Sequence, residues 1–428
     1  MEIWKLRGLI HFFITVFLSS FAFCVVAPAI TDVTMSALCP GRDQCSLAIY
    51  LSGFQQAIMG LGSLVMMPVL GNLSDKYGRK ALLTIPVTLP IIPLAILAYS
   101  RDTPYFYAYF VLKTLTGLVS EGGIISLGHA YMADNIGEQR RAPAFGILSG
   151  VLSAALLSGT LTARFLSTAK TFQVATIASI IGAGYMRIFL KESVADTADD
   201  VERPILKADE DSPITKLPKL HSIPSVGGVL RLFQSSTTFA QAAVVAFFCS
   251  LDFGGLQASL LYFLKARFHY SQTQYADLML ILAVSMIISQ LLLLPAMASI
   301  IREERLLSIG LLMGFVHVFV YSISWSAWVP YASATFGIFS AFTFPCLRSI
   351  VSKQVLPNAQ GMAQGCISGV ESFGQIISPL IFSPLTAWFL SEDAPFDYPG
   401  FSLLCVGFTM MIAFIVSTMI RPPPPAST

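Results

Sequence analysis

Charged side chains are scarce in this chain. Asp, Glu, Lys and Arg make up 12% of its 428 residues, whereas apolar residues make up 55% and the mean hydropathy is +0.71. A soluble domain carries about twice that share of charge, so the composition excludes a soluble multidomain protein, a disordered tail and a secreted disulfide scaffold. A formal net charge of +2 provides no strong field for a nucleic acid. The composition is that of an integral membrane protein.

The chain also lacks the motifs of catalysis and of nucleotide binding. Its five His residues do not have the spacing of metal ligands. Neither a Ser-His-Asp set nor a Gly-rich phosphate loop is recognisable, and no soluble segment is large enough for an ATPase. We therefore expect neither an enzyme nor an ATP-driven pump, and we expect no cofactor.

Long apolar runs fill most of the sequence. A helix that crosses the hydrocarbon core needs about 20 apolar residues, and these runs are too long and too continuous for barrel strands. We predict an all-α membrane protein with twelve transmembrane helices, at residues 8–30, 46–70, 81–99, 105–131, 143–166, 171–190, 237–264, 274–297, 306–325, 328–351, 361–390 and 400–420.

The basic residues are distributed unevenly between the two sides of the predicted spans. Most of the 26 Lys and Arg residues fall on the side of both termini, so the positive-inside rule places both termini in the cytoplasm. Cys39 and Cys45 then lie in the first outer loop, where a small disulfide is favoured over a pair of metal ligands. The plasma membrane, a vacuole and another endomembrane all fit this topology.

Residues 191–232 interrupt the apolar pattern with acids and prolines, which indicates a flexible cytoplasmic linker. The linker divides the chain into a six-helix bundle at 1–190 and another at 233–428. The segment Gly146-Ile-Leu-Ser-Gly-Val151 opens the fifth helix, and Gly365-Cys-Ile-Ser-Gly-Val370 opens the eleventh. This repeat predicts two bundles related by a pseudo-twofold axis, the architecture of a rocking secondary transporter with its substrate site between the halves.

The turn between the second and third helices carries a recognisable motif. The segment Gly71-Asn-Leu-Ser-Asp-Lys-Tyr-Gly-Arg-Lys80 resembles the loop signature of the major facilitator superfamily, with Gly71 and Gly78 at its glycine positions. The resemblance implies that Asp75 latches the cytoplasmic side by docking near the start of the eleventh helix. A helix N-terminus carries partial positive charge and favours an acid. Arg79 and Lys80 are expected in the same charge cluster.

Three shorter segments are similar to the branch of tetracycline-resistance exporters and hippocampus-abundant-transcript proteins. They are Tyr131–Asp134, Arg140–Gly146 and Ser352–Gly361. This similarity implies that Asp134 and Arg141 extend the cytoplasmic latch.

The chain departs from the family pattern in two places. Lys113 stands four residues before Gly117 where the family usually has Arg, so the charge is kept but the bidentate fork is lost. The exporter signature of the fifth helix ends in a proline and a glycine pair, and both are missing from Gly159-Thr-Leu-Thr-Ala-Arg164. The direction of transport is therefore left open.

Four ionisable residues fall roughly midway along predicted spans: Lys113, Glu121, Asp252 and Glu371. Such groups are costly in a membrane, and each is a candidate for substrate or proton binding. The alternative for the acids is a structural ion pair or hydrogen bond. Lys113 either attracts an anionic substrate group or balances an acid. Gln257 either lines the cavity or joins helices.

We therefore predict a secondary transporter that moves a small organic solute by alternating access with proton coupling. It is expected to act as a monomer in the lipid bilayer, without a nucleic-acid partner. Two alternatives remain at this point: an uncoupled facilitator, and a transporter-like receptor or scaffold that binds a ligand without turnover.

Overall fold

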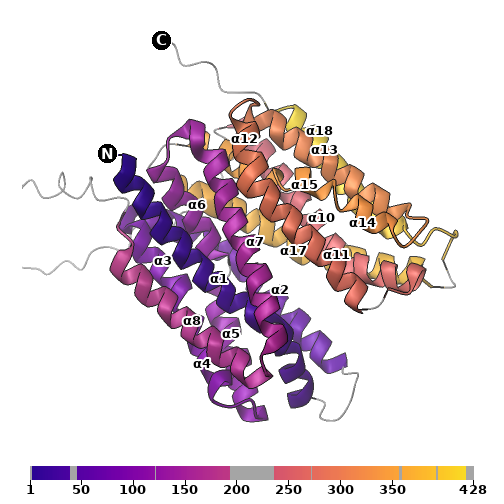
Figure 1. Cartoon of the computed structure of the whole chain (residues 1–428), viewed down its shortest axis with the longest axis horizontal. Helices are drawn as coiled ribbons and strands as arrows, with labels where there is room; N and C mark the ends of the chain where they lie inside the picture. The colour runs from indigo at the N-terminus through magenta and orange to yellow at the C-terminus, as the bar shows by residue number, and fades with distance from the viewer. Residues whose placement is uncertain are drawn as a thin grey trace, which may run out of the picture.

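The computed structural model describes residues 2–38, 46–120, 122–192, 236–270, 272–355, 359–391 and 394–420, which form helices and short connections (Figure 1). The described part contains 12 helices or helix pairs that are long and apolar enough to cross a membrane. The twelve predicted spans are therefore confirmed. The predictions for Cys39, Cys45 and Glu121, and most of the linker, lie outside the described residues.

The first half of the chain forms one six-helix bundle. Its third span is interrupted at Leu89 and Pro90, because proline supplies no N–H to continue the helical ladder. The helices are α1 (Glu2–Leu38), α2 (Ser46–Tyr77), α3 (Arg79–Thr88), α4 (Ile91–Tyr99), α5 (Thr103–Ser120), α6 (Gly123–Asn135), the short η1 (Glu138–Arg140), α7 (Arg141–Phe165) and α8 (Thr168–Phe189).

The second half forms the other bundle, which lies beside the first in Figure 1. Its eighth span contains one turn of π-helix, η2. The helices are α10 (Thr237–Phe268), α11 (Gln272–Ile288), η2 (Ser289–Leu293), α12 (Leu294–Ala298), α13 (Glu303–Ser322), α14 (Val329–Ser333), α15 (Gly337–Ser340), α16 (Thr343–Lys353), α17 (Gln360–Phe389) and α18 (Phe401–Thr418).

The tenth span is broken into α14, α15 and α16, whereas the sequence predicted one helix over 328–351. Two side chains from other spans bond to carbonyl groups of this broken segment. The His317 Nδ1 lies 2.8 Å from the Ser333 carbonyl oxygen, and the Ser289 hydroxyl donates to the carbonyl of Ile338. Backbone irregularity at membrane depth needs such partners. His317 therefore has a structural role.

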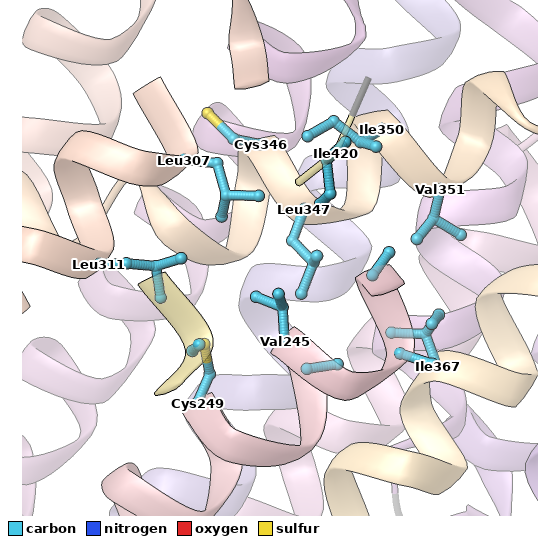
Figure 2. Close-up of a cluster of buried hydrophobic side chains, with 14 of the residues drawn as sticks. Val245, Cys249, Leu307, Leu311, Cys346, Leu347, Ile350, Val351, Ile367 and Ile420 are labelled. Carbon is cyan, nitrogen blue, oxygen red and sulfur yellow. The ribbon is translucent and has the colours of Figure 1, made fainter. Parts of the chain in front are cut away.

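The core of the second bundle is an apolar cluster at the junction of four helices. Figure 2 shows Val245 and Cys249 of α10 facing Leu307 and Leu311 of α13, with side chains of α16 and Ile367 of α17 around them. These residues are buried almost completely. The cluster fixes α10, α13, α16 and α17 relative to one another.

The repeated glycines of the two halves occupy equivalent positions and face the opposite bundle. A Cβ at Gly146 or Gly150 of α7 would collide with Leu294 or Leu291 of the second bundle. A Cβ at Gly365 of α17 would collide with the Met67 carbonyl of α2 in the first bundle. This reciprocal packing is what a pseudo-twofold relation between the bundles requires.

Candidate functional site

Asp75 joins the two bundles near the end of α2. We call this side of the molecule, where α8 ends and α10 begins, the linker side. The Asp75 carboxylate accepts hydrogen bonds from the backbone N–H groups of Gly361 (2.9 Å) and Met362 (3.0 Å), in the first turn of α17. These donors have no partner within their own helix, and the helix dipole favours an anion there.

Arg79 holds the Asp75 carboxylate in position. Its Nη2 lies 2.5 Å from the Asp75 Oδ1, its Nε lies 2.7 Å from the Asp134 Oδ2, and its Nη1 donates to the Ser74 hydroxyl at 2.7 Å. The side chains of Arg79 and Asp75 are 1% and 4% exposed. A guanidinium suits this position because its fork reaches both carboxylates at once. Ser74, the serine of the motif, was not predicted as part of the cluster.

Arg141 makes a second connection between the bundles. Its Nη1 donates to the Ser352 carbonyl at the end of α16, and its Nη2 donates to the Ala133 carbonyl in α6, both at 3.0 Å. The structure thus places Asp75, Arg79, Asp134 and Arg141 along one seam. We call these four residues and the first turn of α17 the linker-side latch.

Lys80 does not belong to the linker-side latch, although the family resemblance predicted it in the same charge cluster as Arg79. Its Nζ donates to the Arg187 carbonyl at 3.0 Å, and its backbone N–H donates to the Glu192 carboxylate. Consecutive helical residues point about 100° apart, so Lys80 turns toward α8 while Arg79 turns inward. Gly78 allows this geometry because its φ of 97° lies in the left-handed region.

Helices α2 and α17 touch backbone to backbone along the seam. Cβ atoms at Gly71, Gly361 or Gly365 would overlap a carbonyl group of the opposite helix, and a Cβ at Gly369 would lie 2.9 Å from the Leu64 oxygen. Small residues allow such close approach between membrane helices. Away from the linker side, Gly60 still contacts Ile376. The bundles are therefore closed from the linker side to about mid-span.

Replacing Gly365 with valine tests this close packing. We expect the variant to lose about 1–3 kcal/mol of free energy of unfolding, because the side chain must displace the backbone of α2. Thermal unfolding in detergent measures the change. Gly184→Val is the matched control, since a Cβ at Gly184 in α8 meets no atom within 4 Å. Equal losses in both variants would contradict the packing argument.

The second seam between the bundles contains the π-helical turn. The Ser153 hydroxyl of α7 lies 3.3 Å from the Gln290 Oε1 of η2. A π-turn shifts the register of the following helix and often occurs at functional positions. Here it faces the first bundle, and Gln290 connects the bundles instead of lining an open cavity.

Glu371 is paired with an arginine that was not among the predicted site residues. Arg348 of α16 is buried, and its Nη2 donates to Glu371 and to the Ser368 hydroxyl (3.0 Å). Its Nη1 donates to the Gln364 carbonyl at 2.9 Å. Arg348 lies within the predicted tenth span, 328–351. That position indicates a cation at membrane depth that needs an acidic partner, and the sequence-based prediction did not use it. The Glu371 Oε1 has no hydrogen-bond partner among the described residues.

Asp252 is the other buried acid of the second bundle. It lies in α10 with 5% of its surface exposed, and its Oδ1 has no partner within the described ranges. Asp252 lies in α10 and Glu371 in α17, and these two helices pack against each other. Two carboxyl groups and the Arg348 guanidinium thus share the interior of one bundle. An acid held without a full set of partners can exchange a proton when its exposure changes.

Of the remaining predicted site residues, Lys113 and Gln257 are described, and neither forms an ion pair or hydrogen bond with these acids in the described part of the chain. Lys113 lies in α5 of the first bundle, half-buried, with its Nζ 5.3 Å from the centre of the Phe23 ring. Gln257 is exposed on α10. Glu121 lies outside the described residues, immediately before Gly122, whose φ is 74°.

Comparisons with known proteins agree with this architecture. The Major Facilitator Superfamily matches residues 12–379 and 242–428. The chain is 23% identical over 332 residues to human hippocampus abundant transcript-like protein 1, covering 78% of this chain and 63% of that protein. It therefore spans less than two thirds of that relative. The chain is 20% identical to the class C tetracycline resistance protein of Escherichia coli, with coverage of 78% and 80%.

A solved structure shares the fold over nearly the whole chain. The human organic anion transporter MFSD10 superposes with a TM-score of 0.77 at 17% identity, covering 96% of this chain and 99% of that one. The loop signature, the paired six-helix bundles and these matches agree. The chain belongs to the Major Facilitator Superfamily, a family of membrane transporters and not of enzymes.

Proposed function

We propose that this protein is a proton-coupled secondary transporter that moves a small organic solute by alternating access. The observation that carries the proposal is the pair of buried acids, Asp252 and Glu371, each with one oxygen that has no hydrogen-bond partner in the part of the chain that the structure describes. Burying a carboxylate at membrane depth costs a few kcal/mol, roughly 3 or more. A cost of this size fits a group that is neutral in one step of a cycle and charged in another.

Alternating access needs a barrier on each side of the solute site that opens in turn. The linker-side latch and the close contact of α2 with α17 at Gly71, Gly361 and Gly365 supply the barrier on one side. A rocking motion of the bundles breaks both sets of contacts together. We place the linker side in the cytoplasm, following the basic residues. We also propose that residues 1–190 and 233–428 move as the two bodies around the linker at 191–232.

Organic anions are the first solutes to test. The structural neighbour MFSD10 is named as an organic anion transporter. In this chain Lys113 is a half-buried cation within the spanning region. A cation at that depth lowers the cost of bringing an anionic group into the membrane.

Solute flux into proteoliposomes tests the proposal. Purified protein is reconstituted, a pH difference is imposed, and accumulation is measured for pooled metabolites beginning with organic anions. We expect accumulation above the external concentration with the gradient and equilibration without it. Equilibration at every pH difference would leave an uncoupled facilitator, and binding without flux would leave a receptor.

Asp252→Asn is expected to abolish gradient-driven accumulation while leaving the protein folded. The amide keeps the shape of the side chain but cannot exchange a proton, so the accumulation ratio should fall to about one. Asp277→Asn is the matched control, because Asp277 is an exposed acid of α11. Full accumulation by Asp252→Asn would remove Asp252 from the coupling mechanism.

A further inference from the structure

An open pocket lined by both charged and apolar side chains lies on the linker side between α13 and α18, away from the seam between the bundles. It has a volume of about 520 Å³, and its polar lining comes from Arg302, Glu304, Arg305, Ser308, Ser417 and Thr418. In Figure 1, α13 and α18 run side by side, and both pack against other helices of the second bundle. The pocket therefore opens where the bundle meets the lipid and the water.

Two guanidinium groups dominate the charge of this pocket. Arg302 and Arg305 are both exposed. The Glu304 carboxylate lies 3.5 Å from the Arg302 Nε and offsets one positive charge. Among the described residues no ion pair is recorded for Arg305. The pocket thus keeps a net positive charge and a guanidinium fork suited to phosphate oxygens.

Hydroxyl groups from both helices share the lining with the arginines, Ser308 from α13 and Ser417 and Thr418 from α18. Ser308 and Ser417 lie 3.0 Å apart across the two helices, and Ser417 is almost fully buried. Thr418 stands beside them at the end of α18. The O–H groups of all three already donate to backbone carbonyls one turn earlier in their own helices, so the guanidinium groups are the donors that a phosphate would meet here.

An apolar stripe on α18, beside the pocket and not part of its lining, runs into the spanning region. Ile412, Ile415 and Met419 recur once per turn and are exposed by 40%, 48% and 58%. Ile415 lies one turn deeper than Thr418, to whose hydroxyl its carbonyl is bonded. A ligand that fits both features has a phosphate group at the water boundary and an acyl chain in the bilayer.

We propose that this pocket binds the phosphate headgroup of an anionic membrane lipid. Basic pockets between transmembrane helices at the cytoplasmic boundary attract such lipids, because the anionic leaflet concentrates them there. The site is independent of the proposed transport function. A lipid bound there would anchor α13 and α18 at the membrane surface while the bundles move.

Titration with a short-chain phosphatidylglycerol tests the site, with thermal unfolding in detergent as the readout. We expect this lipid to raise the melting temperature of the wild-type protein, whereas phosphatidylcholine of the same chain length and inorganic phosphate do not. The variant Arg302→Gln/Arg305→Gln should need about tenfold more phosphatidylglycerol for the same shift, because it loses two charge-assisted contacts. The single variant Arg305→Glu should weaken the response similarly.

Arg140→Gln/Arg187→Gln is the control, because both side chains are exposed on the linker side of the first bundle and the change in charge is equal. The control should respond as the wild type does. An equal loss in the control and in the pocket variants would overturn the proposal in favour of general surface attraction. A shift produced by inorganic phosphate alone would overturn the lipid assignment in favour of free phosphate.

Discussion

Replacing Arg348 with glutamine is expected to be among the most destabilising single changes in this protein. The substitution leaves the Glu371 carboxylate buried without its counter-ion and removes the bonds to Gln364 and Ser368. Breaking a buried ion pair from one side costs about 3–5 kcal/mol. Chemical unfolding in detergent should show a loss of that size, with reduced yield of folded protein.

The companion variant is Arg348→Gln/Glu371→Gln. Removing both charges eliminates the uncompensated carboxylate, so most of the lost stability should return. Glu371→Gln alone should cost less than Arg348→Gln, because Arg348 keeps its bonds to Gln364 and Ser368. If the double variant is as unstable as Arg348→Gln, the pair is not the source of the loss.

Asp75→Asn is expected to shift the protein toward a state that is open on the linker side. The change removes the charge that binds the first turn of α17 and one of the two acids on Arg79. Charge-assisted hydrogen bonds of this kind contribute about 2 kcal/mol, which corresponds to about a thirtyfold shift in the equilibrium between closed and open states.

A cysteine at Leu294 reports the opening. Leu294 is fully buried against Gly146 of the opposite bundle, so Leu294→Cys should react slowly with a water-soluble maleimide and much faster when Asp75→Asn is added. Asp134→Asn is the comparison, since Asp134 binds Arg79, whereas Asp75 binds both Arg79 and the first turn of α17. Equal acceleration by both changes would assign the effect to Arg79 and not to the contact with α17.

The spans could be predicted from the sequence for a physical reason, and the residues of the linker-side latch through the resemblance of residues 71–80 and 131–146 to family motifs. Twelve apolar runs are a property of local composition, and the bilayer imposes their length. Asp75 and Arg79 are four residues apart across the tight turn between α2 and α3, so their proximity also follows from local geometry. Both features depend on residues that are near each other in the chain.

The pairing of Arg348 with Glu371 depends on how two helices are rotated against each other. Helices that are apolar on all sides carry little information about which face is turned inward, and such a pair cannot be derived from hydropathy. The break in the tenth span was missed for a related reason. His317 and Ser289, which bond to carbonyl groups of the broken segment, come from two other spans.

A distance measured across the linker side tests the central claim most directly. Spin labels at Tyr77 of the first bundle and Ile300 of the second, both well exposed, would be attached through introduced cysteines after replacement of the native ones. Alternating access predicts two populations in pulsed dipolar spectra, the shorter matching this structure and the longer increasing in Asp75→Asn. A single distribution that Asp75→Asn, pH and added organic anions all leave unchanged would contradict the account.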